Sequence, residues 1–133
     1  MKKKLISLTL LIIIVLGIAY SLFNNLQSRF EAPRKHTPDI QFTISKNKTL
    51  DAIVGDLKYY DFINDENAFI FALEHTQDDT KGGENFIKVG KGSKTIEREA
   101  VYTISQSMTA WELASVLLNG GTRQDCDHGC PES

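Results

Sequence analysis

The chain has 133 residues with 15 Lys and Arg against 17 Asp and Glu, so its total charge is close to neutral. The first thirty residues carry four basic side chains and no acidic one, which leaves an acidic body. An acidic body disfavours nucleic acid as a partner, and this length leaves room for one small domain rather than a two-domain enzyme.

Residues 5–23 form an apolar stretch without charge or proline, directly after Lys2, Lys3 and Lys4. As a helix the stretch spans about 28 Å, close to the hydrocarbon thickness of a bilayer. The lysines predict a cytoplasmic tip and a single transmembrane helix over 1–23, with the body outside the cytoplasmic membrane. A cleaved signal peptide is the alternative, because Ala19-Tyr20-Ser21 loosely fits a cleavage site.

The segment 24–38 is polar, lacks a clear period and contains Pro33 and Pro38. Such a composition is typical of a linker. We therefore expect a tether over 24–38 that lifts an extracytoplasmic domain, residues 39–121, off the membrane. Residues 122–133 are expected to form a disordered tail.

The body contains an internal repeat, in which residues 42–57 (FTISKNKTLDAIVGDL) match residues 102–117 (YTISQSMTAWELASVL) without a gap. Each copy predicts a short strand, 40–45 or 101–105, then a polar turn and an amphipathic helix. Thr49 and Thr109 stand at the expected N-caps. We expect the second helix to end at Gly120-Gly121, with a glycine in the left-handed conformation.

Between the copies, Asn64 or Asp65 is expected to cap a helix over 66–75. A hairpin is expected next, with strands at 86–89 and 95–101 around Gly90-Lys-Gly92. The order of elements predicts a small α+β module with a repeated strand–helix unit.

The chain resembles a known family in a set of ordered features. They are the N-terminal apolar anchor, a strand ending in Ile44, the Tyr60-Asp-Phe-Ile63 segment, a helix bearing Phe69, and Tyr102–Ala114 closing on Asn119-Gly-Gly. Over residues 5–121 this pattern is similar to the N-terminal part of the YceG-like family, the endolytic murein transglycosylases also named MltG. The resemblance implies a LysM-like subdomain that engages the glycan strands of peptidoglycan outside the membrane.

The resemblance also implies where a glycan would bind. LysM-type sites use the loop between the first strand and first helix together with the loop before the second strand. The matching positions here are Ser45–Lys48 with Thr49 and the residues around Thr76–Asp79; the repeat supplies a further loop, Ser105–Met108. Trp111 or Tyr60 could offer an apolar face to a sugar ring. The alternative is that the polar residues only form turns and caps. The glycan-binding candidates are Ser45, Lys46, Asn47, Lys48, Thr49 and Trp111.

No catalytic residue is carried over from the family, whose catalytic domain follows the LysM-like part. Only residues 122–133 follow here, and Glu132 has no scaffold to position it. Glu74, Glu97, Glu99 and Glu112 match no catalytic position, and no cofactor or metal is implied. This chain alone is expected to bind rather than cleave. The alternatives are a truncated or split transglycosylase, and a scaffold for other cell-wall enzymes.

Both cysteines, Cys126 and Cys130, stand in the tail. An extracytoplasmic location favours a small disulfide loop between them. An unstructured tail, or a metal site that includes His128, is the alternative.

Overall fold

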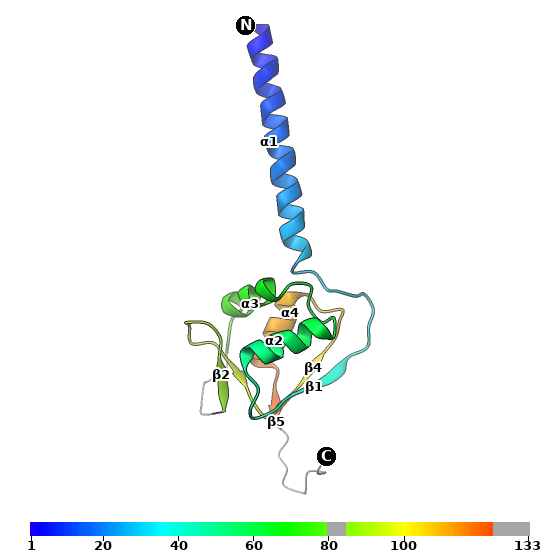
Figure 1. Cartoon of the computed structure of the whole chain (residues 1–133), viewed down its shortest axis with the longest axis vertical. Helices are drawn as coiled ribbons and strands as arrows, with labels where there is room; N and C mark the ends of the chain where they lie inside the picture. Colours follow the sequence, from blue (N-terminus) through cyan, green and yellow to red (C-terminus); the bar gives the residue numbers. More distant parts are fainter. Residues whose placement is uncertain (80–84, 124–133) are drawn as a thin grey trace, which may run out of the picture.

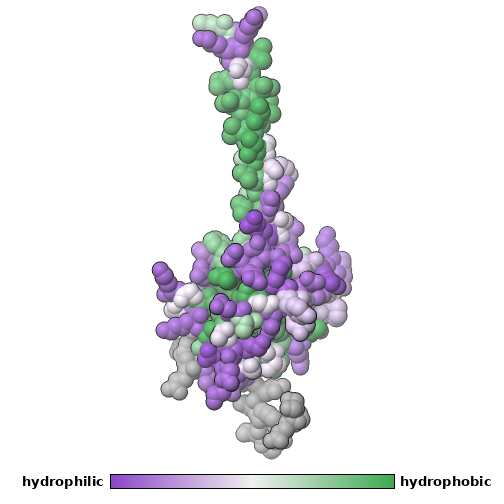
Figure 2. All heavy atoms as spheres, viewed as in Figure 1, coloured by the Kyte–Doolittle hydropathy of each residue, from purple (hydrophilic) through white to green (hydrophobic). Residues whose placement is uncertain are grey.

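Helix α1 (Lys2–Ser28) projects from the rest of the chain in the computed structural model, which describes residues 1–79 and 85–123 (Figure 1). None of its residues is buried against the protein. Figure 2 shows a continuous apolar band along α1 below the polar N-terminal end. The helix is long and apolar enough to cross a membrane. It also continues through residues 24–28, so the first third of the expected tether is helical.

The body is a mixed α+β domain. Its strand β1 pairs with β4, and β4 pairs with β5, in an antiparallel sheet; β2 and β3 form a separate hairpin. The predicted strands 40–45, 101–105 and 86–89 and the helix 66–75 are confirmed to within one residue at each end, whereas the predicted strand 95–101 is shorter and ends at Glu97. The elements are β1 (Ile40–Ile44), α2 (Leu50–Tyr59), α3 (Glu66–His75), β2 (Phe86–Lys88), β3 (Thr95–Glu97), β4 (Ala100–Ile104), α4 (Ala110–Asn119) and β5 (Thr122–Arg123).

Both repeat copies begin their helices as predicted. The Thr49 hydroxyl accepts from the backbone N–H of Ala52 at 3.3 Å, and the Thr109 hydroxyl accepts from Glu112 at 3.2 Å. The Glu112 carboxylate also accepts from the Thr109 N–H at 2.7 Å, which completes a capping box. The first copy has alanine at the matching position, so its cap is a single bond.

The core lies between the three-stranded sheet and helices α2, α3 and α4 (Figure 1). Side chains alternate across a strand, so Ile40, Phe42 and Ile44 of β1 share one face. Each Leu or Ile removed fully from water contributes about 1.5–3 kcal/mol to folding. The apolar stripes predicted on both helices are buried, namely Ile53, Val54 and Leu57 on α2 and Leu113, Ala114 and Leu117 on α4.

The end of α4 differs from the prediction. Gly120 has a φ of −104°, so it is not left-handed. The neighbouring glycine is required by a close approach instead, because a Cβ on Gly121 would lie 2.9 Å from the ring of Tyr102. The chain then pairs with β4 at Thr122 and Arg123, where a disordered tail was expected to start. The predicted Cys126–Cys130 disulfide lies outside the described residues.

Candidate ligand-binding groove

The rest of the expected tether packs onto the domain, because residues 30–37 follow the turn between β4 and α4. The Phe30 carbonyl accepts from the Ala110 N–H at 2.8 Å, and the Arg34 N–H donates to the Gln106 carbonyl at 3.1 Å. The Ser105 hydroxyl donates to the Thr37 carbonyl at 3.1 Å. The segment is therefore a wall of the domain rather than a free linker.

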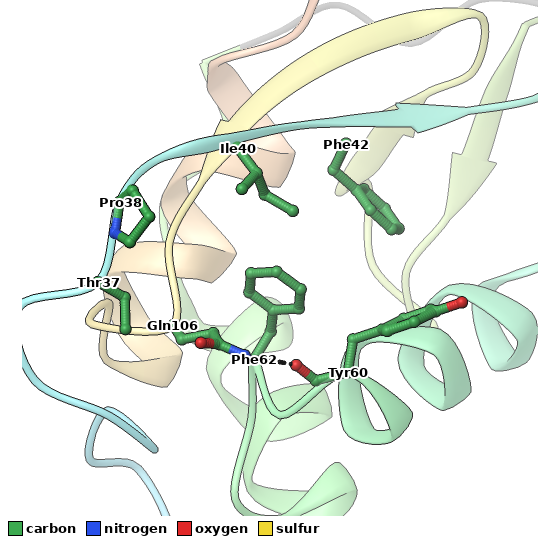
Figure 3. A pocket seen from close by; sticks show the side chains of 7 residues that line it. All are labelled: Thr37, Pro38, Ile40, Phe42, Tyr60, Phe62 and Gln106. Carbon is green, nitrogen blue, oxygen red and sulfur yellow. Dashed lines mark hydrogen bonds between the residues drawn. The ribbon is translucent and has the colours of Figure 1, made fainter.

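A groove opens where this wall reaches the start of β1 (Figure 3). We call it the β1 groove; its cavity volume is about 350 Å³. Ile40 and Phe42 point into it from the strand, and Phe62 points toward them from the opposite side. Phe62 is buried and forms the floor, whereas Ile40 stays exposed. The groove is lined by Thr37, Pro38, Ile40, Phe42, Tyr60, Phe62 and Gln106.

The end of α2 brings two aromatic rings into the groove. Asp61 is left-handed with a φ of 58°, a conformation that aspartate tolerates better than most side chains. The Phe62 N–H donates to the Leu57 carbonyl at 2.8 Å, and the Asp61 N–H donates to the Lys58 carbonyl at 3.2 Å. These two bonds form a Schellman motif with aspartate in the usual glycine position. The reversal leaves Tyr60 and Phe62 on the side facing β1 (Figure 3).

The side chains of Gln106 and Thr37 place polar atoms at one end of the groove, and the Tyr60 hydroxyl lies at the other (Figure 3). The Gln106 side-chain amide donates to the Tyr60 carbonyl at 2.9 Å, which fixes its orientation, and Thr37 lies beside it (Figure 3). None of the seven lining side chains is an acid or a base of the Asp, Glu, Lys, Arg or His type. An apolar cleft of this volume with a few polar groups is typical of a small-ligand site. Its chemistry suits a neutral ligand with apolar faces and hydroxyl or amide groups.

The predicted loop Ser45–Thr49 lies at the other end of β1. In the register of the sheet, Ile44 is opposite Ala100, whereas Ile40 at the groove is opposite Ile104. Ser45, Lys46 and Asn47 are exposed on this turn. Lys48 pairs with the Asp56 carboxylate. This lysine and the cap residue Thr49 therefore have structural roles.

Trp111 lies apart from that loop, at the start of α4. Its ring stacks on Phe30 at 5.4 Å between centroids and meets Phe71 edge-on at 6.1 Å. The structure therefore divides the six predicted glycan-binding residues between opposite ends of β1 and β4. Two other residues considered from the sequence do line the groove: Tyr60, and Gln106 in the Ser105–Met108 loop.

The segment Thr76–Asp79 does not take the place that the resemblance implies. The Asp79 N–H donates to the Asn119 side chain at 2.8 Å, and Asp78 accepts from the Thr95 N–H at 2.6 Å, so the segment lies against α4 and β3. The residues beside the first loop are instead those just before β4. The Arg98 Nε donates to the Lys48 carbonyl at 3.3 Å, and the Glu99 N–H donates to the Ile44 carbonyl at 2.7 Å.

Sequence reasoning missed five groove residues: Thr37, Pro38, Ile40, Phe42 and Phe62. A usable signal was the Tyr60-Asp-Phe62 triplet after a helix, since a helix end of this kind places a hydrophobic residue directly after the left-handed one. The other signal was the match between Phe42 and Tyr102 in the repeat. Tyr102 is fully buried in the core, whereas Phe42 is only partly buried at the edge of the core.

Tyr102 is fully buried outside the groove. Burial raises the pKa of Tyr102 well above its usual range, and the Glu97 carboxylate raises it further. Its hydroxyl donates to the Glu97 carbonyl at 2.6 Å, which makes it a core group.

No protein-family model, curated protein or solved structure matches this chain. What the chain binds must therefore be argued from the geometry of the groove.

Proposed function

We propose that this protein is a single-pass, membrane-anchored, extracytoplasmic module that binds peptidoglycan glycan strands through the β1 groove. The observation that carries the proposal is that three aromatic rings lie together with one side-chain amide and two hydroxyl groups in an uncharged cleft. Phe42, Tyr60 and Phe62 offer apolar faces to sugar rings. Gln106 and Thr37 can hydrogen-bond the hydroxyl and acetamido groups of such a ligand.

The order of elements supports a LysM-like assignment. Strand β1 is followed by helices α2 and α3, then by the β2–β3 hairpin and by strand β4, which pairs antiparallel with β1. The sequence itself predicts this strand–helix–helix–strand core with a trailing helix. The β2–β3 hairpin is an insertion before β4, and α4 is an addition after it.

The orientation follows from the charges that flank α1. Lys2, Lys3 and Lys4 precede the apolar stretch, and positively charged ends stay in the cytoplasm. The domain then lies on the outer side of the cytoplasmic membrane. In this proposed orientation, the groove faces the compartment in which a glycan strand of the cell wall is found.

A retention assay on purified, insoluble peptidoglycan tests the proposal with the full chain in detergent. We expect the wild-type chain to stay bound in high salt, because the groove carries no charge. Tyr60→Ala should weaken binding about tenfold, equivalent to about 1.4 kcal/mol. Tyr59→Ala is the matched control, since Tyr59 is exposed and does not line the groove.

Asn47→Ala separates the groove from the loop predicted from the sequence. The groove proposal requires this variant to bind like the wild type. Loss of binding in Asn47→Ala with retention in Tyr60→Ala would move the site to the Ser45–Thr49 turn. Failure of the wild-type chain to bind would remove glycan as the ligand, and release of anhydro-ended glycan would show that the chain cleaves as well as binds.

A further inference from the structure

An aromatic cluster lies where α1 joins the domain. Phe30 stacks on Trp111 with an interplanar angle of 12° and meets Phe71 edge-on at 6.0 Å. His75 stacks on Phe71 with 3.9 Å between the ring centroids. Trp111 is 40% exposed and Phe71 is 46% exposed, so two large rings present bare faces to their surroundings. The β1 groove does not use either ring.

The junction fixes this cluster relative to α1. The Asn64 side-chain amide donates to the carbonyl of Ser28 at 3.2 Å and to that of Glu31 at 2.9 Å. The Phe30 carbonyl accepts from the Ala110 N–H, which holds the helix exit against the start of α4. An apolar cleft of about 380 Å³ separates the end of α1 from α3 and is continuous with the cluster through Phe30 and Phe71.

The length of α1 sets the depth of the cluster in the membrane. The apolar stretch ends at Phe23, and the helix continues to Ser28. These five residues rise about 7.5 Å, at about 1.5 Å each. The headgroup layer of one leaflet is about 5–7 Å thick. Phe30 and the rings packed on it therefore lie at the boundary between headgroups and water, and Figure 1 shows α3 and α4 on the side of the domain nearest α1.

We propose that the exposed faces of Phe71 and Trp111 rest against the outer edge of the headgroup layer of the outer leaflet and dock the domain onto the membrane. Tryptophan and other aromatic rings concentrate at this depth because one part of the ring system is apolar and the other tolerates water. The surface is continuous with the membrane-spanning helix, which makes lipid its nearest neighbour. This inference rests on the anchoring part of the proposed function and is independent of glycan binding.

Trp111 is the sole tryptophan of the chain, so its fluorescence reports the docking directly. The full chain is reconstituted in phosphatidylcholine vesicles with and without a nitroxide on the lipid headgroup. We expect the headgroup nitroxide to reduce Trp111 emission at least twofold. Iodide in the outer buffer should quench it several-fold less than it quenches a fully exposed tryptophan.

The control moves the tryptophan to the far end of the domain in the double variant Trp111→Phe/Lys46→Trp. Phenylalanine keeps an aromatic ring against Phe30, and residue 46 is exposed on the turn after β1. Its emission should respond strongly to iodide and little to the headgroup nitroxide. Equal iodide quenching of the two proteins, with no effect of the nitroxide on Trp111, would overturn the docking.

Resistance to alkaline carbonate extraction separates the two proposals. If the chain stays in the vesicles while Trp111 behaves as free in water, the docking alone is wrong. If carbonate extracts the chain, the anchor is wrong and the docking falls with it.

Discussion

The two repeat copies share residues but differ in what covers them. Ser45 and Ser105 hold matching positions, yet Ser45 is exposed and Ser105 is 1% exposed. Likewise Phe42 is half-buried on the edge strand β1, whereas Tyr102 is fully buried on the central strand β4. Equal local sequence gives equal strands, turns and capped helices. The burial of each copy depends on segments that arrive from elsewhere.

The covering segments explain why a groove forms beside the first copy. Residues 30–37 lie against the turn of the second copy, and β5 pairs with its strand. Gly121 continues into β5 over the Tyr102 ring, whereas the matching residue Asp61 turns the chain away into α3. As a result, the Phe42 ring is not fully covered and lines the β1 groove. Whether the matching ring is buried in the core or lines a groove therefore depends on the segments packed against each copy, and not on the repeated sequence itself.

The largest expected difference in stability between the two copies comes from replacing the matching rings Tyr102 and Phe42 with alanine. Tyr102→Ala should lower the free energy of unfolding by about 3–5 kcal/mol, because the side chain is fully buried. Phe42→Ala should cost about half as much, since its ring is only partly covered. Urea unfolding in detergent, followed by Trp111 fluorescence, measures both. Equal losses would show that the two rings have similar environments.

The two serines give the next largest contrast. The Ser105 hydroxyl bonds the Thr37 carbonyl, accepts from the Ser107 N–H at 3.1 Å and lies 2.7 Å from the Ser107 hydroxyl. Ser105→Ala should cost about 1–3 kcal/mol, because buried polar groups lose a partner. Ser45→Ala should change stability by less than about 0.5 kcal/mol. The same urea titration measures both changes in the free energy of unfolding. A loss in Ser45→Ala as large as that in Ser105→Ala would contradict the difference between the two copies.

The raised pKa of Tyr102 gives a pH dependence. Above about pH 10 the unfolded chain loses this phenolic proton, whereas the folded chain keeps it because burial disfavours the charge. Folding is therefore stabilised fully below pH 10 and loses about 1.4 kcal/mol per pH unit above it. Tyr102→Phe should remove this part of the alkaline slope. An unchanged slope in Tyr102→Phe would mean that other groups cause it.

The smallest expected effect comes from giving the first copy the cap of the second. Ala52 occupies the position that Glu112 holds in the capping box. Ala52→Glu should let the carboxylate accept from the Thr49 N–H and stabilise the domain by about 0.5 kcal/mol. Ala52→Gln is the uncharged comparison. A loss of stability in both variants would show that the site does not accept the longer side chain.

The sequence predicts the elements well because their signals are local. Thr49 and Thr109 mark helix starts, and the spacing of Ile53 and Leu57 marks a buried face. The prediction for the end of α4 was wrong because it took no account of Tyr102, a buried ring nineteen residues earlier. Gly121 is required by the close approach of that ring and not by a left-handed backbone. The packed segment 30–37 was missed for a related reason, since backbone bonds to Gln106 and Ala110 leave no pattern in composition.

The groove was only partly predictable for the same reason. Tyr60 was named from the sequence as an aromatic face for a sugar ring, within the site that the LysM resemblance implies. Ile40 and Phe42 look like ordinary core residues of a strand, and only the course of the chain after α2, at Tyr60 and Phe62, shows that they line a groove. The loop Ser45–Thr49 follows from the LysM resemblance, and its glycan-binding role stays a prediction.

Residue-resolved NMR of the full chain in nanodiscs, titrated with a soluble peptidoglycan tetrasaccharide, tests the central proposal most directly. The account predicts saturable shift changes concentrated on Ile40, Phe42, Tyr60 and Gln106, with the Ser45–Thr49 turn unaffected. Shift changes centred on that turn, or none at saturating ligand, would contradict it.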